Sequence, residues 1–336
     1  MTVEQESCDK RRNFEAGIYE KMVSVLMLAY NHEDYIAEAI ESVLSQECTF
    51  SFELVIGEDC STDNTRSICE QYASQFPDKV KLLASEKNHG IQGNFLRTLE
   101  SCFDSEYTAF CEGDDKWADT NKLQYQFEFL RSNPEYLAHA HNVVYRDLRS
   151  GEDSPYGITK DGVCLKEDLF NVLPFHVSSL FVKATILKKI PIKALPYFIS
   201  GDKFLCRWLA SHGDVYYEGS ISMAIYHRHL TGASENSDYI ELRYQNLDML
   251  MFFEHNFEFM ITLIKQAKHI AIEDLYYQLA CTQNKELVGR NRFKDFFYYA
   301  TSMSFKSMRK RELYMLLIIL FGRPFFILDE FSKKAY

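Results

Sequence analysis

Acidic side chains follow two stretches of this sequence that are otherwise apolar. Glu58 and Asp59 come directly after the apolar run 53–57, and the segment 112–115 (EGDD) comes directly after the run 107–111. Carboxylates gathered in one place repel one another and therefore favour a bound cation. Carboxylate oxygens are also the ligands that Mg²⁺ and Mn²⁺ prefer. The two clusters therefore predict a divalent-metal site, provided that the fold brings them together.

The elements around these clusters alternate between apolar runs and helical patterns. Runs with β-branched residues read as buried strands, and apolar residues at helical spacing follow each of them. This alternation predicts a mostly parallel, Rossmann-like α/β sheet flanked by helices on both faces. Ligands of such sheets bind outside the carboxyl ends of the strands, where both acidic clusters fall. The predicted strands are 23–29, 53–57, 80–84 and 107–111, and the predicted helices begin near residue 33 and cover 64–75 and 92–102.

The pattern loosens beyond residue 124 and becomes helical again near the C-terminus. We expect an N-terminal extension (1–21), a sheet-containing domain (22–235) and a helical C-terminal region (236–336). Glycine, proline and acidic residues predict a loop from 151 to 162. Between the two regular parts the sequence predicts helices at 121–132, 184–189 and 201–212, strands near 139–146 and 177–182, and further helix over 239–308.

Composition excludes several classes of protein. The chain has 336 residues, 46% of them hydrophobic, and a net charge of −11, so a folded globular protein is expected and nucleic acid is not a partner. Its nine cysteines include no C-x-x-C pair, which favours reduced thiols in the cytoplasm. The polar N-terminus lacks the apolar region of a secretory signal. The most apolar run, 313–321, is far shorter than the roughly 20 residues that span a bilayer.

Four segments in order carry a family resemblance. VSVLMLAYN (23–31), ELVIGEDCSTDNT (53–65), EKNHGIQGNF (86–95) and AFCEGDDKW (109–117) resemble the nucleotide-sugar-binding half of a family-2 glycosyltransferase of the GT-A fold. The resemblance extends over about residues 22–232 and is to enzymes of bacterial surface-polysaccharide assembly. It implies that 22–118 bind the donor and that 119–235 bind the acceptor.

The resemblance implies a metal motif after the fourth strand. Asp114 would be the ligand of Mg²⁺ or Mn²⁺, which bridges the phosphates of the donor and neutralises the charge of the leaving group. Glu112 stands where the family more often has Asp, so it would reach the metal through water or contact the sugar and ribose. Gly113 and Asp115 would line the donor site. The alternative is a solvated acidic loop without a ligand.

Other residues match the family's contacts to the base and ribose. Asp59 would accept hydrogen bonds from the base and ribose, and Glu58 could share that role. Further donor contacts are implied for Ala29, Tyr30, Asn31 and Asn94. The alternative is that this loop only caps a helix, through Ser61, Thr62 or Asp63, and for Asp63 we favour the cap.

The acceptor half should supply a general base. Asp202, in the segment Ser200-Gly201-Asp202, matches the family's acidic residue beneath the acceptor and would take a proton from the attacking hydroxyl in an inverting displacement. An acid in a first helical turn is the alternative, and the two roles are compatible. Within the segment 226–232, which resembles Y-R-x-H-x-G-G, His229 would bind the metal and Arg228 the donor. His176 and Trp117 are expected at the acceptor.

The sequence therefore predicts an inverting, metal-dependent glycosyltransferase. Its donor would be a nucleotide-diphosphate sugar, with UDP favoured, and its acceptor a glycan or lipid-linked glycan. The alternatives are a catalytically silent relative that binds nucleotide or glycan as an assembly partner, and a nucleotidyltransferase, although no G-x-G-x-x-G or lysine-bearing phosphate loop is present.

Basic residues precede the apolar run near the C-terminus. Lys306, Arg309, Lys310 and Arg311 come just before residues 313–321. This pattern suits a helix at the inner face of the plasma membrane. A helix that packs on the domain or on a second subunit in a homodimer is the other alternative, and we favour it slightly.

Overall fold

The computed structural model describes residues 21–157, 160–195, 198, 200–229 and 239–281. The chain separates into two compact units. One comprises Met1–Leu195 with Ile199–Glu235, and the other Pro196–Phe198 with Asn236–Tyr336. Apart from Lys21, the expected extension 1–21 lies outside the described residues, and so do the basic and apolar residues between 306 and 321.

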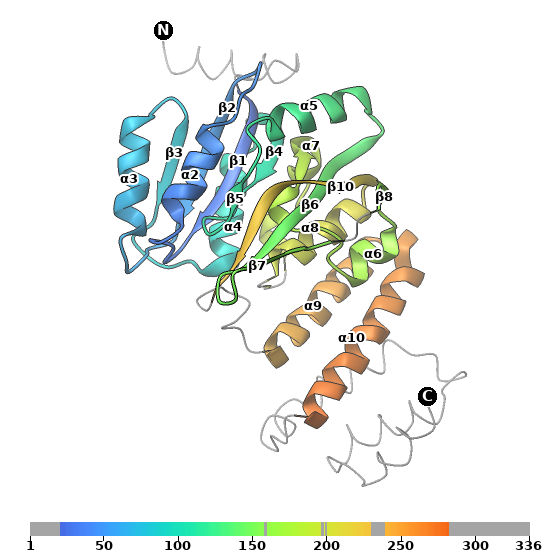
Figure 1. Ribbon diagram of the computed structural model, residues 1–336. Helices are drawn as coiled ribbons and strands as arrows, with labels where there is room; N and C mark the ends of the chain where they lie inside the picture. Colours follow the sequence, from blue (N-terminus) through green and yellow to red (C-terminus); the bar gives the residue numbers. More distant parts are fainter. Residues whose placement is uncertain (1–20, 158–159, 196–197, 199, 230–238, 282–336) are drawn as a thin grey trace, which may run out of the picture. The chain divides into compact units, whose positions relative to one another are not determined.

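The first half of the sheet unit contains the strand and helix succession that the sequence predicts (Figure 1). Each strand agrees with its predicted range to within two residues at either end. The elements are β1 (Lys21–Ala29), α2 (Ile36–Leu44), β2 (Phe52–Glu58), α3 (Thr65–Gln75), β3 (Val80–Ala84), α4 (Gly90–Ser101) and β4 (Ser105–Phe110).

The second half departs more from the prediction. The segment 177–182 is not one strand but a 3-10 turn followed by a short strand, and the expected loop 151–162 contains a strand. A strand of 15 residues, β10, was not predicted. The elements are β5 (Lys116–Trp117), α5 (Lys122–Ser132), β6 (Tyr136–Asp147), β7 (Glu152–Pro155), β8 (Gly162–Val163), α6 (Lys166–Asn171), η1 (Val177–Ser179), β9 (Phe181–Lys183), α7 (Ala184–Leu187), η2 (Ile192–Ala194), α8 (Gly201–Ala210) and β10 (Asp214–Arg228).

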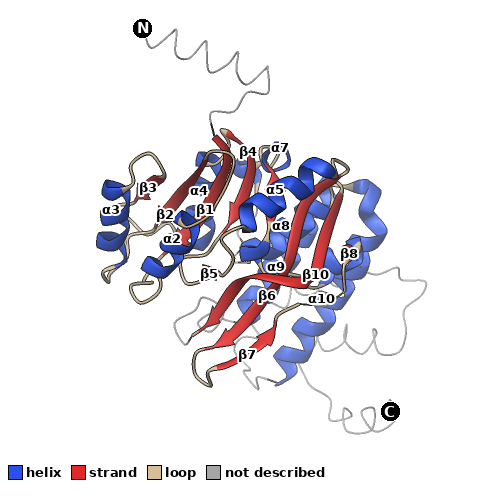
Figure 2. Cartoon of the chain, turned by 45° about the horizontal axis from the view of Figure 1, so that its top comes forward, coloured by secondary structure: helices blue, strands red, loops and turns tan. Residues whose placement is uncertain are grey.

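All the strands belong to one sheet, which Figure 2 shows in red. Its main order is β3-β2-β1-β4-β9-β6-β10-β5, with β7 on β6 and β8 on β10. Strands β1 to β4 are parallel to one another, as are β6 and β10. Because β9 is antiparallel to both β4 and β6, these two strands run in the same direction. The carboxyl ends of β1, β2, β4, β6 and β10 therefore lie at one edge of the sheet.

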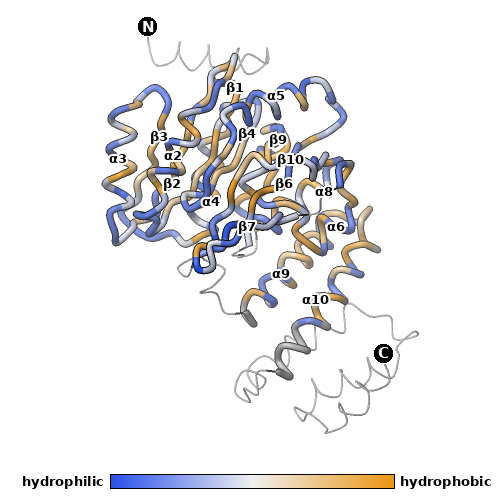
Figure 3. The backbone as a smooth tube through the Cα atoms, in the orientation of Figure 1, coloured by the Kyte–Doolittle hydropathy of each residue, from blue (hydrophilic) through white to orange (hydrophobic). Residues whose placement is uncertain are grey.

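Helices cover both faces of this sheet because its strands are apolar on both sides. On one face, alternate residues of β1 (Val23, Val25 and Met27) join α2, α3 and α5 in a single core cluster. On the other face, α4 packs against Gly57 of β2, where an added Cβ would clash with Thr98. Figure 3 shows the central strands mainly in hydrophobic colours and the β7 hairpin in hydrophilic ones.

The second unit is helical in its described part. It contains α9 (Tyr239–Asn256), the 3-10 turn η3 (Glu258–Met260) and α10 (Ile261–Cys281), so the helix expected from 239 is interrupted near Phe257. The remainder of the predicted range, 282–308, lies outside the described residues. In the part of the chain that is described, none of the helices has both the length and the apolar character needed to cross a membrane.

Candidate active site

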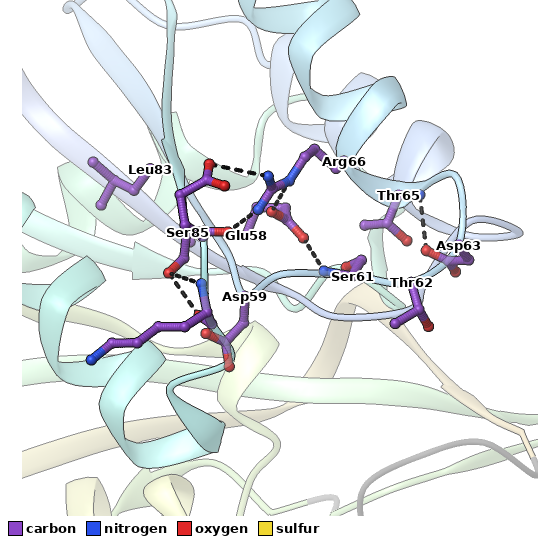
Figure 4. Close-up of polar contacts among 12 residues, drawn as sticks. Glu58, Asp59, Ser61, Thr62, Asp63, Thr65, Arg66, Leu83 and Ser85 are labelled. Atoms are coloured by element: carbon purple, nitrogen blue, oxygen red, sulfur yellow. Dashed lines mark hydrogen bonds and ion pairs between the residues drawn. The ribbon is translucent and has the colours of Figure 1, made fainter.

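The loop after β2 fixes Glu58 in a structural role (Figure 4). Glu58 is fully buried, accepts a hydrogen bond from the Ser61 backbone N–H (2.6 Å) and forms an ion pair with Arg66 (Nε to Oε2, 2.8 Å). Burial by itself would raise the pKa of Glu58, but the hydrogen bonds from Ser61 and Arg66 lower it below its usual value. The Glu58 carboxylate is thus charged and occupied by partners within the protein.

Asp59 faces away from that ion pair, as Figure 4 shows. It is almost fully buried, and its Oδ1 accepts a hydrogen bond from the backbone N–H of His89 (2.8 Å). Its own N–H donates to the carbonyl of Ala29 (3.0 Å), which joins the ends of β1 and β2. No described residue donates to Oδ2, so this oxygen is available for a ligand.

The same loop also shows how α3 begins. Asp63 accepts from the backbone N–H of Thr65 (Oδ1, 2.9 Å), and its other oxygen accepts from the N–H of Glu33 (3.1 Å). The expected cap by Asp63 is therefore confirmed.

Asn31 joins the loop after β1 to the loop after β2. Its backbone is in the left-handed region (φ 56°), which asparagine tolerates better than most residues. Its Oδ1 accepts from the Thr62 N–H (2.8 Å), and its own N–H donates to the Ser61 hydroxyl (3.1 Å). Tyr30 beside it is exposed, so its ring is open to a ligand, whereas the side chain of Asn31 is engaged with Thr62.

Asn94 lies on α4 and contacts β2. It is buried, and its Nδ2 donates to the carbonyl of Gly57 (2.7 Å), while its Oδ1 has no hydrogen-bond partner within the described part of the chain. This contact holds α4 against β2.

The acidic loop after β4 packs tightly against the loop after β1. The N–H of Gly113 donates to the carbonyl of Leu28 (2.9 Å). A Cβ on Gly113 would lie 2.7 Å from the carbonyl oxygen of Leu28 and 2.8 Å from Nδ1 of His32. Only glycine fits at this position without a shift of the backbone, so the loop is held where its neighbours Glu112 and Asp114 flank the end of β1.

One carboxylate oxygen of Asp114 lies close to two imidazole rings. Its Oδ2 lies 3.0 Å from Nε2 of His229 and 3.6 Å from Nε2 of His32. Burial would raise the pKa of Asp114, but His32 and the hydrogen bond from His229 hold it at about 2. Asp114 is therefore an ionised carboxylate, and the structure brings it together with His229 as the sequence predicted.

Asp115 is directed into the protein. It is 2% exposed, its Oδ1 accepts from the backbone N–H of His227 (3.2 Å), and its Oδ2 accepts from the hydroxyl of Ser178. Burial and the adjacent Asp114 carboxylate raise its pKa well above the usual value. Asp115 thus contacts β10 and the segment 176–178, where it also lies 3.5 Å from Nδ1 of His176.

Glu112 and Asp202 bring two further carboxylates to the same edge. Burial, Asp114 and Asp202 together raise the pKa of Glu112 to about 8. Asp202 lies in the first turn of α8, where burial raises its pKa and the Lys203 N–H donates to its Oδ1 (2.7 Å). Although 90 residues separate them in the sequence, these two acids are close enough to interact.

The remaining predicted residues, His176, Trp117 and Arg228, each contact another residue of the sheet unit. The ring of His176 stacks on Tyr226 with centroids 4.3 Å apart, and burial lowers its pKa to about 4. Trp117 is buried and donates its indole N–H to the carbonyl of Ser178 (3.0 Å). Arg228 donates to the hydroxyl of Tyr145 (3.0 Å).

Sequence reasoning missed His32 and Ser178. His32 stands in the turn after the first predicted strand, so its position at the carboxyl edge was a usable signal. No comparable signal existed for Ser178, because its contact with Asp115 spans 63 residues.

The site offers a divalent cation few ligands from the protein. No set of three or more His, Cys, Asp or Glu side chains among the described residues has the spacing of a complete metal site. Asp114 is nevertheless ionised and flanked by imidazole nitrogens, and Mg²⁺ at phosphate sites is typically held by one or two protein carboxylates plus substrate oxygens. The residues present fit a cation that binds together with a diphosphate.

Comparison with known proteins gives the same family as the sequence motifs. Residues 24–185 match the model of glycosyl transferase family 2, which confirms the predicted family resemblance. The putative teichuronic acid biosynthesis glycosyltransferase TuaG of Bacillus subtilis is 37% identical over 112 residues, which cover 33% of this chain and 43% of TuaG. An uncharacterized protein of Mycobacterium bovis is 36% identical over 135 residues, which cover 40% and 39% of the two chains. This chain thus spans about two fifths of the length of these curated relatives.

Solved structures share the fold. S. aureus TarS 1-349 in complex with UDP-GlcNAc superposes with a TM-score of 0.59 at 16% identity, over 88% of this chain and 84% of that one. The mannosyltransferase PcManGT of Pyrobaculum calidifontis, in complex with GDP-Man and Mn²⁺, gives a TM-score of 0.52 at 16% identity, over 90% and 85%. These matches confirm the predicted GT-A-like fold.

Proposed function

We propose that this chain, whose residues 24–185 match glycosyl transferase family 2, transfers a sugar from a nucleotide-diphosphate donor to a hydroxyl of a glycan in surface-polysaccharide assembly. The observation that carries the proposal is the meeting of Glu112, Asp114 and Asp202 with His229 at the carboxyl edge of the sheet. These groups come from the end of β4, the first turn of α8 and the end of β10.

The nucleotide would bind at the ends of β1 and β2. Asp59 is buried, and one of its oxygens has no hydrogen-bond donor among the described residues, which suits an acceptor of hydrogen bonds from a base or ribose. Exposed Tyr30 lies on the same edge and offers a ring to the base. We favour UDP as the nucleotide, since the TarS structure of the same fold contains UDP-GlcNAc.

The diphosphate would bind near Asp114. Asp114 and His229 are the residues that would hold Mg²⁺ or Mn²⁺, and half-buried Glu112 would reach the cation through water or contact the sugar. When bound, the cation neutralises the charge that develops on the leaving diphosphate. Arg228, at the end of β10, would add positive charge to the same region.

Asp202 would act as the general base of an inverting displacement. It lies in the first turn of α8, and its carboxylate lies near Glu112, which interacts with Asp114. A hydroxyl bound between Asp202 and the donor would lose its proton to Asp202 as it attacks the anomeric carbon. His176 and Trp117 would line the acceptor side. A contact of the C-terminal region with a membrane or a second subunit stays a prediction.

Asp202→Asn separates chemistry from binding. The variant should retain donor affinity and lose about 10²- to 10⁴-fold in turnover, because a general base acts on the acceptor in the transition state. Asp168→Asn is the matched control, since Asp168 also lies in the first turn of a helix, α6. We expect this control to transfer sugar at the wild-type rate.

Transfer is measured with a panel of UDP- and GDP-sugars and polysaccharide fragments, and donor affinity by calorimetry. Wild-type turnover in Asp202→Asn would contradict the base assignment. Wild-type protein that binds donor but transfers to no acceptor in the panel would favour the catalytically silent relative.

A further inference from the structure

The two carboxylates of the acidic loop face different directions, although they are adjacent in the sequence. Asp114 faces His32 and His229, whereas Asp115 is buried and its two oxygens accept from the His227 N–H and the Ser178 hydroxyl. A carboxylate whose oxygens are engaged in this way is poorly placed to bind a donor. The expected role of Asp115 in donor binding therefore lacks support from its geometry.

The partner of Asp115 lies at the end of the strand that carries His229. The backbone N–H of His227 donates to Asp115, and Nδ1 of the same residue contacts the carbonyl of Asp114 at 2.9 Å. His227 is thus fixed to the acidic loop on two sides. Residues i and i+2 of an extended chain project to the same side, so fixing His227 also directs His229 toward that loop. The observed 3.0 Å contact between His229 and Asp114 agrees with this arrangement.

Ser178 anchors Asp115 from a third segment. The serine lies in η1, whose neighbouring carbonyls accept from Trp117 (3.0 Å) and from Gln126 of α5 (2.8 Å). Trp117 is two residues beyond Asp115, and Nζ of Lys122 lies over its ring, 4.1 Å from the ring centroid. Ser178 is therefore held by contacts that do not depend on Asp115, and it offers a fixed donor to that carboxylate.

We propose that Asp115 and Ser178 are positioning residues, which hold the end of β10 against the acidic loop and so place His229 at the carboxylate of Asp114. This inference rests on the proposed function, because it concerns residues assigned to the metal and diphosphate. Asp115 itself touches neither the donor nor the cation. Groups behind a metal ligand typically contribute about 10- to 100-fold to metal affinity, so the effect is measurable.

Ser178→Ala and Ser179→Ala form a matched pair. Both serines are buried in the same 3-10 turn, but the hydroxyl of Ser179 donates to the carbonyl of His176 (2.7 Å) and not to Asp115. In the presence of UDP, Ser178→Ala should weaken Mn²⁺ binding by about tenfold or more, whereas Ser179→Ala should stay within about twofold of wild type. Equal Mn²⁺ affinities in the two variants would overturn the proposal.

A second measurement does not depend on the metal. The imidazole signals of His229 in metal-free protein, assigned with His229→Gln, should shift in Ser178→Ala and not in Ser179→Ala. Unchanged signals in Ser178→Ala would overturn the proposal even if the protein bound no nucleotide. Wild-type protein that binds neither UDP nor GDP with Mn²⁺ would count against the proposed function, and the His229 signals would still test the positioning.

The conservative variant at Asp115 distinguishes positioning from direct binding. In Asp115→Asn the amide oxygen can accept from His227, and the amide N–H₂ can donate to the Ser178 hydroxyl, so the arrangement is kept. Asp115→Asn should therefore restore most of the Mn²⁺ affinity that Asp115→Ala loses. If Asn proved as poor as Ala, the charge of Asp115 would be acting directly on the ligand, and the positioning role would be wrong.

Discussion

Single residues at the edge of the sheet differ in function because their surroundings differ, even where their types are the same. Glu58 and Asp59 are adjacent acids after one strand, yet Glu58 is paired with Arg66 while Asp59 retains an oxygen without a partner among the described residues. The sequence marks both positions as candidates. The local contacts favour Asp59 as the ligand-binding acid and Glu58 as the one that holds the loop.

Asp59→Ala should weaken UDP binding by at least about tenfold, because charge-assisted hydrogen bonds to a ligand typically contribute about 1.5 to 3 kcal/mol. Asp63→Ala, in the same loop, is the control. Asp63 caps α3 through Thr65, so its loss should lower the melting temperature while leaving UDP affinity unchanged. Calorimetric titration with UDP in the presence of Mn²⁺ measures both affinities. Equal affinity in Asp59→Ala and wild type would show that Asp59 does not bind the nucleotide.

Lys122 is a buried basic residue outside the ligand site. Its side chain is fully buried, with Nζ 2.7 Å from Gln126 Oε1 and the Trp117 ring on one side. Burial lowers its pKa to about 7. Around it, burial likewise lowers the pKa of His139 to about 3 and that of His141 well below its usual value.

Replacing Lys122 should change how stability depends on pH. Between pH 7 and about 10.5 the unfolded chain binds the lysine proton more strongly than the folded protein does, so stability from this group rises with pH across that window. Relative to wild type, Lys122→Met should be more stable near pH 6.5, and this advantage should shrink by more than about 1 kcal/mol by pH 9.5. Urea unfolding of both proteins at pH 6.5 and pH 9.5 measures this difference in the free energy of unfolding. A constant difference would mean that Lys122 titrates normally.

At the scale of elements, the strand and helix units from β1 to β4 were predictable because each is a local pattern. An apolar run such as 23–29 and the helical spacing after it are visible in the sequence without knowledge of their partners. The carboxyl-edge rule then located Asp59 and Asp114. The pairing of β1 with β2 and of β2 with β3 joins strands that follow one another, and β4, which pairs with β1, is the exception.

The second half was harder because its elements depend on distant pairing. β10 pairs with β6 through register shifts near Ser222, and these irregularities interrupt the alternation that marks a strand. The contact of His229 with Asp114 joins residues 115 apart, so no local pattern predicts it. The resemblance to a family supplied that expectation, whereas the buried orientation of Asp115 required the structure.

The close packing of the acidic loop at Gly113 allows a prediction about stability. Gly113→Ala should destabilise the protein by about 1 to 3 kcal/mol, because its Cβ would press on the backbone of Leu28 and on His32. Gly201→Ala is the control, since no atom of the described residues outside its chain neighbours and its own helix backbone lies within 4 Å of a Cβ there. Urea unfolding gives both free energies of unfolding. If Gly113→Ala were as stable as Gly201→Ala, the tight contact between the two loops would be wrong.

At the scale of the whole molecule, the charge of the chain opposes its proposed ligand. The net charge is −11, and a nucleotide diphosphate is also anionic. The acids gathered at the carboxyl edge would repel such a ligand unless a cation bound with it. We therefore expect nucleotide and metal to bind together. This expectation follows from the charge of the whole chain and not from one residue.

The most direct test is a thermal-shift measurement of the full chain with UDP, GDP, dTDP and CDP, each with and without Mn²⁺, on wild type and Asp114→Asn. A ligand at 100 times its dissociation constant stabilises the folded state by about 2.7 kcal/mol, which shifts the melting temperature by several degrees. We expect one nucleotide, UDP first, to stabilise wild type only with Mn²⁺, and we expect Asp114→Asn to lose the shift. Stabilisation by none of the nucleotides, or an equal shift in Asp114→Asn, would contradict the proposed donor site.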